Sequence, residues 1–327
     1  MKRREFITLL GGAPVWPLAA RAQQPTLPIV GFVNGRSPDV SARHAAAFRK
    51  GLNETGYVES QNVTVEYHWL DGQYDRLPAL MSELVRRQVA VIATPGSNPA
   101  SLAAKAATTT IPIVFGVGGD AVKLDLVTSL ARPGGNATGY NIFVMEVVAK
   151  RLGLLHELVP KAARIAVLVN PAHAPSAEAT LRDVQEAARA IGLQIHVLRA
   201  STSREIETAF ATLARERADA LFVAPDAFFA SSASKFATLA ARHGIPASYS
   251  SRELVEAGGL MSYGADNLAM FPQAGMYTGR ILRGAKPADL PVVQSTKFEF
   301  VINLQMARAL GLEVPNSIQL LADEVIE

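Results

Sequence analysis

The sequence predicts an α/β protein with two Rossmann-like lobes, each built on a parallel sheet. Short apolar runs alternate with segments whose apolar residues recur at helical spacing, which is the pattern of buried strands and amphipathic helices. The alternation comes in two blocks, at about 28–135 and 163–250. A chain of 327 residues that is 49% hydrophobic has material for about two domains. Buried strands joined by helices are typical of parallel sheets covered on both faces.

The expected strands of the first block are mostly continuous apolar runs. The exception is 62–69, where apolar and polar residues alternate as in a strand with one exposed side. The block's expected strands are 28–33, 62–69, 89–93 and 112–117, and its expected helices are 39–55, 74–87, 100–107 and 123–131. A further strand at 136–143 and a helix at 146–159 are expected between the two blocks.

The second block repeats this pattern without any repeat of residues. Its expected strands are 163–170, 193–200, 219–226 and 246–250, and its expected helices are 176–191, 203–216 and 231–242. After this block we expect strands at 260–264 and 297–303 and helices at 268–283 and 304–310. The segments after residue 260 have two interpretations, since they either decorate the second lobe or cross back between lobes as hinges.

Residues 1–22 have the pattern of a cleaved export signal. Basic residues precede an apolar run from Phe6 to Ala20, and Ala20-Arg21-Ala22 is a cleavage pattern. The Arg3-Arg4 pair indicates the twin-arginine route, and an ordinary secretory leader is the alternative. This run is too short to span a bilayer comfortably, and no later apolar run reaches about 18 residues. We therefore expect a periplasmic protein without stable membrane insertion.

Charge and cysteine content exclude several classes. The net charge is +3, and the leader alone carries this excess, so the rest of the chain is neutral. Basic residues are dispersed among acids, which argues against a nucleic-acid partner. The chain has no cysteine, so disulfides and thiolate sites are excluded.

The candidate ligand site lies where the strands end. In open α/β sheets, ligands bind beyond the carboxyl ends of strands, where helix N-termini offer free N–H groups. Many of the polar residues found there are also ordinary caps and turn formers, but Phe228, Tyr249 and Tyr263 are not, and aromatic faces beside a few polar groups are typical of a small-molecule cleft. The candidates are Asn34, Thr94, Gly96, Ser97, Asn98, Gly118, Asp120, Asn170, Asp226, Phe228, Tyr249 and Tyr263.

Individual candidates have distinct expected roles. Gly96 allows close approach of a ligand to the main chain. Ser97 or Asn98 caps the next helix while its amides face a carboxylate, and Asp120 and Asp226 are the partners for a ligand ammonium. His173 also follows a strand, where a solvated loop histidine is the alternative to a ligand contact.

No catalytic or metal motif emerges. Residues 116–121, GVGGDA, match a loose dinucleotide pattern, but they lie outside the first strand–helix turn and lack the acidic residue about 20 positions later. The phosphate-loop, serine-hydrolase and zinc-protease motifs are absent. We therefore expect no cofactor, no metal and no enzymatic activity, although carboxylates distant in sequence leave an exported α/β enzyme as the alternative.

Several segments together resemble one family. They are the leader, GLNETGYVESQNVTVEYHW (51–69), YDRLPALMSELVRRQVAVIA (74–93), the stretch 106–139, LVPKAARIAVLVNP (158–171), EAGGLMSYGAD (256–266) and FEFVINLQMARALGL (298–312). The chain resembles the TrpX-like, tryptophan-binding-type substrate-binding proteins of ABC transporters. It departs from the family pattern at Ala121, where proline is frequent, and at His173, where Asn or Asp is frequent.

The resemblance implies a type I periplasmic-binding architecture, with a cleft between lobes that closes on a small solute such as an amino acid or aromatic compound. Lobe I would comprise 27–141 plus about 266–287, and lobe II 142–265 plus about 288–327. The implied partners are a membrane permease and an ATPase; a sensory receptor stays an alternative. The three aromatic candidates would flank the ligand side chain, and Asn34 and Asn170 would add polar contacts.

Overall fold

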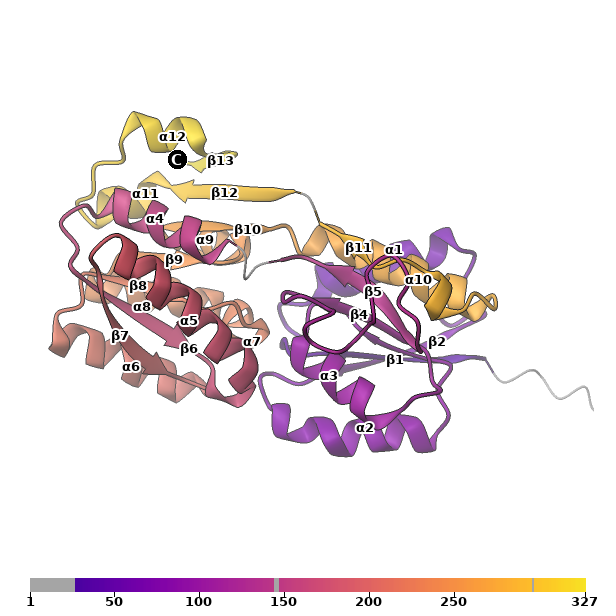
Figure 1. Ribbon diagram of the computed structural model, residues 1–327. Coiled ribbons are helices and arrows are strands. Elements are labelled where there is room, and N and C mark those ends of the chain that lie inside the picture. The colour runs from indigo at the N-terminus through magenta and orange to yellow at the C-terminus, as the bar shows by residue number, and fades with distance from the viewer. Residues whose placement is uncertain (1–26, 144–146, 296) are drawn as a thin grey trace, which may run out of the picture.

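The computed structural model describes residues 27–143, 147–295 and 297–327, so the predicted export signal lies outside the described residues. Two α/β lobes lie side by side, with the strands of each lobe in a separate sheet (Figure 1). The chain crosses between the two lobes three times, because consecutive strands along the sequence change from one sheet to the other at three places. The predicted fold class is confirmed.

The first sheet is entirely parallel, with the order β11-β5-β4-β3-β1-β2. Its strands are β1 Ile29–Asn34, β2 Thr64–Trp69, β3 Val91–Thr94, β4 Ile113–Val117, β5 Ala137–Asn141 and β11 Val293–Gln294. Its helices are α1 Ala42–Glu54, α2 Leu77–Arg86, preceded by the 3-10 turn Tyr74–Arg76, α3 Asn98–Ala107 and α10 Phe271–Leu282, preceded by the turn Leu268–Met270.

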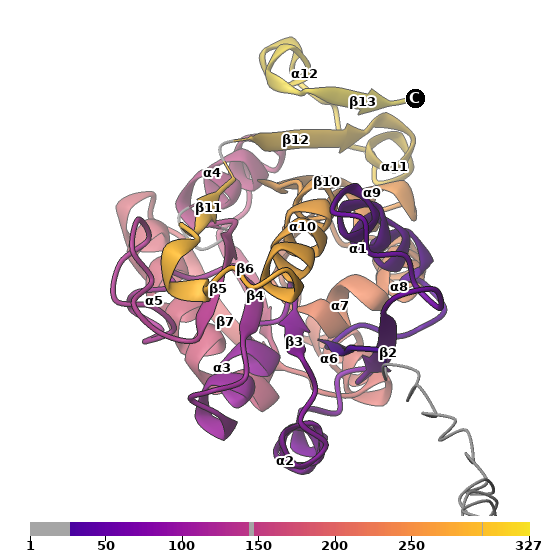
Figure 2. The same ribbon diagram turned by 90° about the vertical axis from the view of Figure 1, so that its right-hand side faces the viewer.

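Alternation along the strands divides the first lobe into two cores. Phe32 packs with α1 and α10 on one face, and its neighbour Val33 packs with α2 on the other. The helices α1 and α10 lie side by side over this sheet (Figure 2). Their backbones touch at Gly51, where a Cβ would lie 1.9 Å from the carbonyl oxygen of Pro272. Sequence-distant segments therefore build one lobe.

The second sheet has the order β13-β12-β10-β9-β8-β6-β7 and is parallel except between β10 and β12. Its strands are β6 Arg164–Val169, β7 Gln194–Arg199, β8 Ala220–Val223, β9 Ala247–Tyr249, β10 Met261–Ala265, β12 Phe298–Asn303 and β13 Glu324–Ile326.

Helices cover both faces of the second sheet. One core includes side chains of α4, α5, α11 and α12, and the other includes those of α6, α7, α8 and α9. These helices are α4 Val148–Leu158, α5 Ala174–Ala190, α6 Ser203–Glu216, α7 Ala227–Ser231, α8 Ala233–His243, α9 Arg252–Glu256, α11 Leu304–Ala309 and α12 Asn316–Leu321. Two further 3-10 turns are Pro171–His173 and Pro287–Asp289.

Two expectations about the chain path are corrected. The helix predicted at 123–131 is a series of turns, because Asp125 has φ of 54°, which a right-handed helix does not allow. The last crossing lies between Gln294 and Phe298 rather than at about 288, because β11 pairs with β5 in the first sheet. Within the described residues, no helix is long and apolar enough to cross a membrane.

Candidate functional site

A cavity of about 90 Å³ lies between the lobes, beyond the carboxyl ends of strands from both sheets. Residues of both lobes form its wall, so its shape depends on how the lobes meet. The lining residues are Arg36, Tyr74, Gly96, Ser97, Asn98, Pro99, Gly118 and Ile142 from the first half of the chain, and His173, Ser176, Pro225, Asp226, Ala227, Ala230, Ser250, Ser251, Ala265 and Asn267 from the second.

The first-lobe wall centres on the turn between β3 and α3. Ser97 is the N-cap of α3, and its hydroxyl accepts a hydrogen bond from Ala100 N at 3.4 Å. Pro99 has no N–H, and Ser97 N donates to Gly116 O. The main-chain N–H of Asn98 is therefore the donor that this first turn of α3 can still offer to an anion.

The Asn98 side chain joins three segments. Its Oδ1 accepts from Gly118 N at 2.9 Å, which holds the end of β4 against the start of α3. Its Nδ2 donates to Ser176 Oγ at 3.3 Å, across the cleft on α5. The side chain of Asn98 thus fixes the cavity wall by joining α3, the end of β4 and α5.

Asp226 is the acidic group of the second-lobe wall. Its Oδ1 caps the five-residue helix α7 by accepting from Phe228 N and Phe229 N at 2.9 and 3.2 Å. Its Oδ2 accepts from the Tyr74 hydroxyl of the first lobe at 3.3 Å. Burial raises the pKa of this carboxyl, although its hydrogen bonds oppose the shift. Among the described residues, no cationic side chain forms an ion pair with it.

Arg36 brings a buried positive charge to the cavity. Its Nη1 lies 2.8 Å from Glu253 Oε2 of the second lobe, and His44 Nε2 lies 3.1 Å from Glu253 Oε1. Burial alone would raise the pKa of Glu253, but Arg36 and His44 hold it well below its usual range. Within the described chain, the buried Arg36 Nε has no hydrogen-bond partner. Arg36 therefore keeps one unpaired donor at a residue that lines the cavity.

His173 is buried rather than solvated, so the simpler interpretation of the sequence was wrong for this residue. Its ring lies 6.5 Å from the ring of Tyr74 across the cleft, and its Nε2 is 3.4 Å from Ser176 Oγ. Burial lowers the pKa of His173 to about 4, so the imidazole is neutral at pH 7.

The structure brings five of the twelve sequence-predicted site residues together at the cavity. They are Gly96, Ser97, Asn98, Gly118 and Asp226. Three polar candidates outside it serve their own lobe: Asn34 bonds Pro95 O and Arg36 N, Thr94 pairs with Ser101 at 2.9 Å, and Asn170 Oδ1 accepts from Ala172 N. Asp120, the alternative ammonium partner, instead accepts from Val122 N and Lys123 N.

The three aromatic candidates also lie outside the cavity. Tyr249 is fully buried in the second-lobe core against Phe236, and Tyr263 stacks on Phe298. Both belong to strands, so their side chains stand perpendicular to the sheet instead of projecting from its end. Phe228 packs in the same core, where its ring faces Gly72 of the first lobe.

Other lining residues were missed, and some of them carried a signal. Arg36, Ser250 and Ser251 stand in segments that follow strands, as the accepted candidates do. Tyr74 and Ser176 lie on a 3-10 turn and a helix, where nothing in the sequence points toward the cleft.

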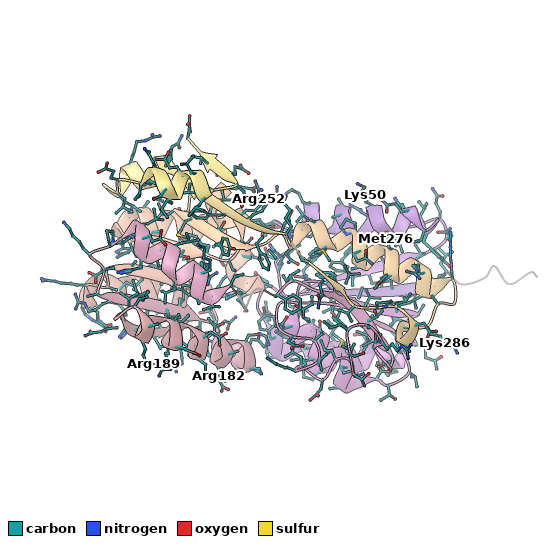
Figure 3. The ribbon with its side chains drawn as sticks, turned by 45° about the horizontal axis from the view of Figure 1, so that its top comes forward. Lys50, Arg182, Arg189, Arg252, Met276 and Lys286 are labelled. Atoms are coloured by element: carbon teal, nitrogen blue, oxygen red, sulfur yellow. The ribbon has the colours of Figure 1, made fainter. Side chains whose placement is uncertain are left out.

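A second cavity of about 290 Å³ adjoins the first and shares Arg36, Ser250, Ser251, Ala265 and Asn267 with it. Charged side chains dominate its wall, including Arg43, Glu253, Glu256, Asp266 and Glu299. Arg252 also lines this cavity and lies near the junction of the lobes (Figure 3). Its guanidinium forms ion pairs with Glu256, Glu299 and Glu324. In the part of the chain that the structure describes, no group of His, Asp and Glu could hold a metal ion.

Two α/β lobes that enclose a polar cavity between their strand ends define a two-lobe solute-binding protein. The model of the ABC transporter substrate-binding protein family matches residues 29–326. The chain therefore belongs to this family, and the type I periplasmic-binding architecture and the TrpX-like resemblance are confirmed.

Similar proteins extend this assignment. A tyrosine-binding protein of Clostridioides difficile is 28% identical over 266 residues, covering 81% of this chain and 76% of that protein. A Vibrio cholerae conserved domain protein has a TM-score of 0.80 at 25% identity, with 92% and 100% of the chains covered. The L-Trp complex of an ABC domain from Streptococcus pneumoniae scores 0.79 at 24% identity and the same coverage. A ligand-free, open substrate-binding protein of Clostridium difficile scores 0.61 at 26% identity, covering 92% and 99%.

Proposed function

We propose that this chain is an exported receptor of an ABC importer, which captures an amino acid between its lobes and delivers it to a membrane permease driven by an ATPase. Family membership supports the transport role, and the leader pattern at 1–22 supports export to the periplasm by the twin-arginine route. The binding of L-Trp and tyrosine by similar proteins supports an amino acid as the ligand. The protein would bind its ligand without converting it.

The observation that carries the amino-acid proposal is the pair of opposite charges at one cavity. Asp226 offers a half-buried carboxylate without a cationic partner among the described residues, which suits a ligand ammonium. Arg36 and the amide of Asn98 offer donors that suit a ligand carboxylate. This arrangement keeps the ammonium role expected for Asp226 and adds Arg36 to the carboxylate role expected for the start of α3.

Binding would act through closure of the two lobes. Tyr74, Arg36 and Asn98 of the first lobe already contact Asp226, Glu253 and Ser176 of the second. These contacts between the lobes give the cleft a closed arrangement. A ligand that touches both walls favours this closed state, because only differential affinity shifts a conformational equilibrium.

Thermal unfolding in the presence of the twenty amino acids tests the proposal. A true ligand should raise the free energy of unfolding by about 2.7 kcal/mol at a hundredfold excess over Kd. The chain recovered after incubation should release the ligand chemically unchanged. A panel that produces no stabilisation at all contradicts amino-acid binding. Loss of uptake on deletion of the gene, with binding intact in vitro, separates the permease role from a sensory one.

A further inference from the structure

We propose that the cavity selects amino acids with small side chains and excludes phenylalanine, tyrosine and tryptophan. This inference rests on the proposed function, because it names the substrate class of the same site. It differs from the ligands named for the similar proteins, which are tyrosine and L-Trp.

The first argument is volume. The cavity measures about 90 Å³, whereas an engineered apolar cavity of about 150 Å³ is what accommodates a single benzene molecule. At roughly 10 to 15 Å³ for each water-sized group, 90 Å³ holds about six to nine such groups. The ammonium, Cα and carboxylate of an amino acid account for five of them. About one to four non-hydrogen atoms then remain for the side chain.

The second argument is that protein rings already fill the aromatic space. Tyr74 and His173 meet from opposite lobes with their centroids 6.5 Å apart, and the Tyr74 hydroxyl is held by Asp226. Phe228 packs in the second-lobe core with its ring against Gly72. Besides Tyr74 and His173, no described aromatic side chain lines the cavity, so a ligand ring would find as its aromatic partners only the two rings that already meet across the cleft.

The third argument concerns the adjoining cavity, which is the remaining direction in which a large side chain could extend. That space lies past the buried Arg36–Glu253 pair and is lined by Arg43, Glu256 and Glu299. An apolar ring placed there would remove charged groups from water without offering them hydrogen bonds, which is unfavourable. The wall shared with the first cavity carries Ser250 and Ser251, whose hydroxyls suit a short polar side chain.

Calorimetry on the purified chain tests this selection with glycine, alanine, serine, threonine and asparagine against phenylalanine, tyrosine, tryptophan and arginine. The best small amino acid should bind at least a hundredfold more tightly than any of the four large ones. A large amino acid that binds within tenfold of the best small one overturns the size selection while leaving the receptor function intact. If none of the nine binds, the selection fails, and the proposed function fails with it only if none of the twenty amino acids stabilises the chain.

Two substitutions probe the volume directly. Ile142→Ala enlarges the wall and should reduce the preference for the best small amino acid over phenylalanine at least tenfold. Ala230→Val narrows the cavity from the side of α7, and it should weaken the binding of threonine at least tenfold more than the binding of glycine. Unfolding temperatures identify a variant that does not fold, in which case the other variant still decides. Unchanged affinity ratios in the folded variants contradict a limit set by cavity size.

Discussion

The two walls of the cleft use different chemistry. The first-lobe wall at Gly96, Ser97 and Asn98 presents mainly backbone, because the Ser97 and Asn98 side chains are engaged in capping and bridging. The second-lobe wall presents side chains, above all Asp226. Backbone donors are set by the fold and change little with sequence, whereas side-chain groups change with one substitution. We therefore expect the second wall, together with Arg36, to decide which ligand is bound.

The largest effect is expected for Asp226→Asn. Removing one partner of a buried charge pair costs about 2 to 5 kcal/mol, so the Kd of the best amino acid should rise by roughly 30-fold or more. Asparagine still caps α7, so the free energy of unfolding without ligand should change by less than about 1 kcal/mol. Calorimetry and urea unfolding measure both. Glu178→Gln, at an exposed position of α5, is the control, and equal affinities for the two variants would contradict the role of Asp226.

A smaller effect is expected from the ion pairs that join the lobes. Glu253→Gln leaves Arg36 buried without its anion, so the closed state should lose about 1.5 to 3 kcal/mol and ligand affinity about 10- to 150-fold. Arg43→Gln removes the outer pair with Glu256, in which Arg43 is 61% exposed, and such pairs contribute only about 0.2 to 1 kcal/mol. Titration of both variants compares them. Similar losses would mean that burial of the inner pair is irrelevant to closure.

The pH dependence of ligand binding should reflect the protonation of His173. Its pKa is lowered from 6.5 to about 4 in the closed arrangement, so the neutral form is favoured there. An open form binds the proton below about pH 6.5, and closure must release it, so affinity falls as pH decreases from 6.5 to 4. The decrease is at most about tenfold per pH unit.

His173→Gln isolates this contribution. The raised pKa of Asp226 also weakens binding of an ammonium at low pH, and this part is common to both proteins. The ratio of wild-type to variant affinity between pH 7 and pH 4.5 is therefore the measurement. Parallel profiles would show that His173 keeps its charge state on closure.

The smallest effect is expected on the backbone wall. Gly96 has φ of 72°, and a Cβ there would lie 2.8 Å from Asn267 Nδ2. Gly192 has φ of 73° with no atom within 4 Å of its Cβ position. Both Gly→Ala changes should cost about 1 to 2 kcal/mol of stability through the left-handed conformation. Only Gly96→Ala should also weaken ligand binding, by several-fold. Equal ligand affinity of both variants would contradict a role of Gly96 in the cavity wall.

The fold could be predicted because each strand carries its burial in the sequence. Alternating side chains such as Phe32 and Val33 enter opposite cores, and this local pattern survives in any arrangement of the lobes. The wrongly predicted helix at 123–131 has suitable apolar spacing, but the backbone at Asp125 interrupts it, and spacing contains no information about that conformation.

The site could be predicted only in part, because it depends on tertiary geometry. Asp226 and Asn98 follow strands and lie at the cavity, as strand ends do in this class of sheet. Tyr249 is the last residue of β9 and Tyr263 lies within β10, so both side chains stand on a face of the sheet, where they enter a core or stack on its edge. Tyr74 and Ser176 reach the cavity through the docking of one lobe on the other, which no local pattern encodes.

The return of α10 and β11 to the first lobe has a consequence for biosynthesis. On the ribosome, β1 to β5 emerge early, but the helix that packs beside α1 and the strand that covers the β5 edge emerge after nearly the whole second lobe. Until α10 and β11 are synthesised, the first lobe exposes the apolar surface that they later cover. Contacts between segments so distant along the chain also form slowly. Nascent chains stalled before residue 271 should therefore recruit holdase chaperones, and chains that have passed residue 294 should release them.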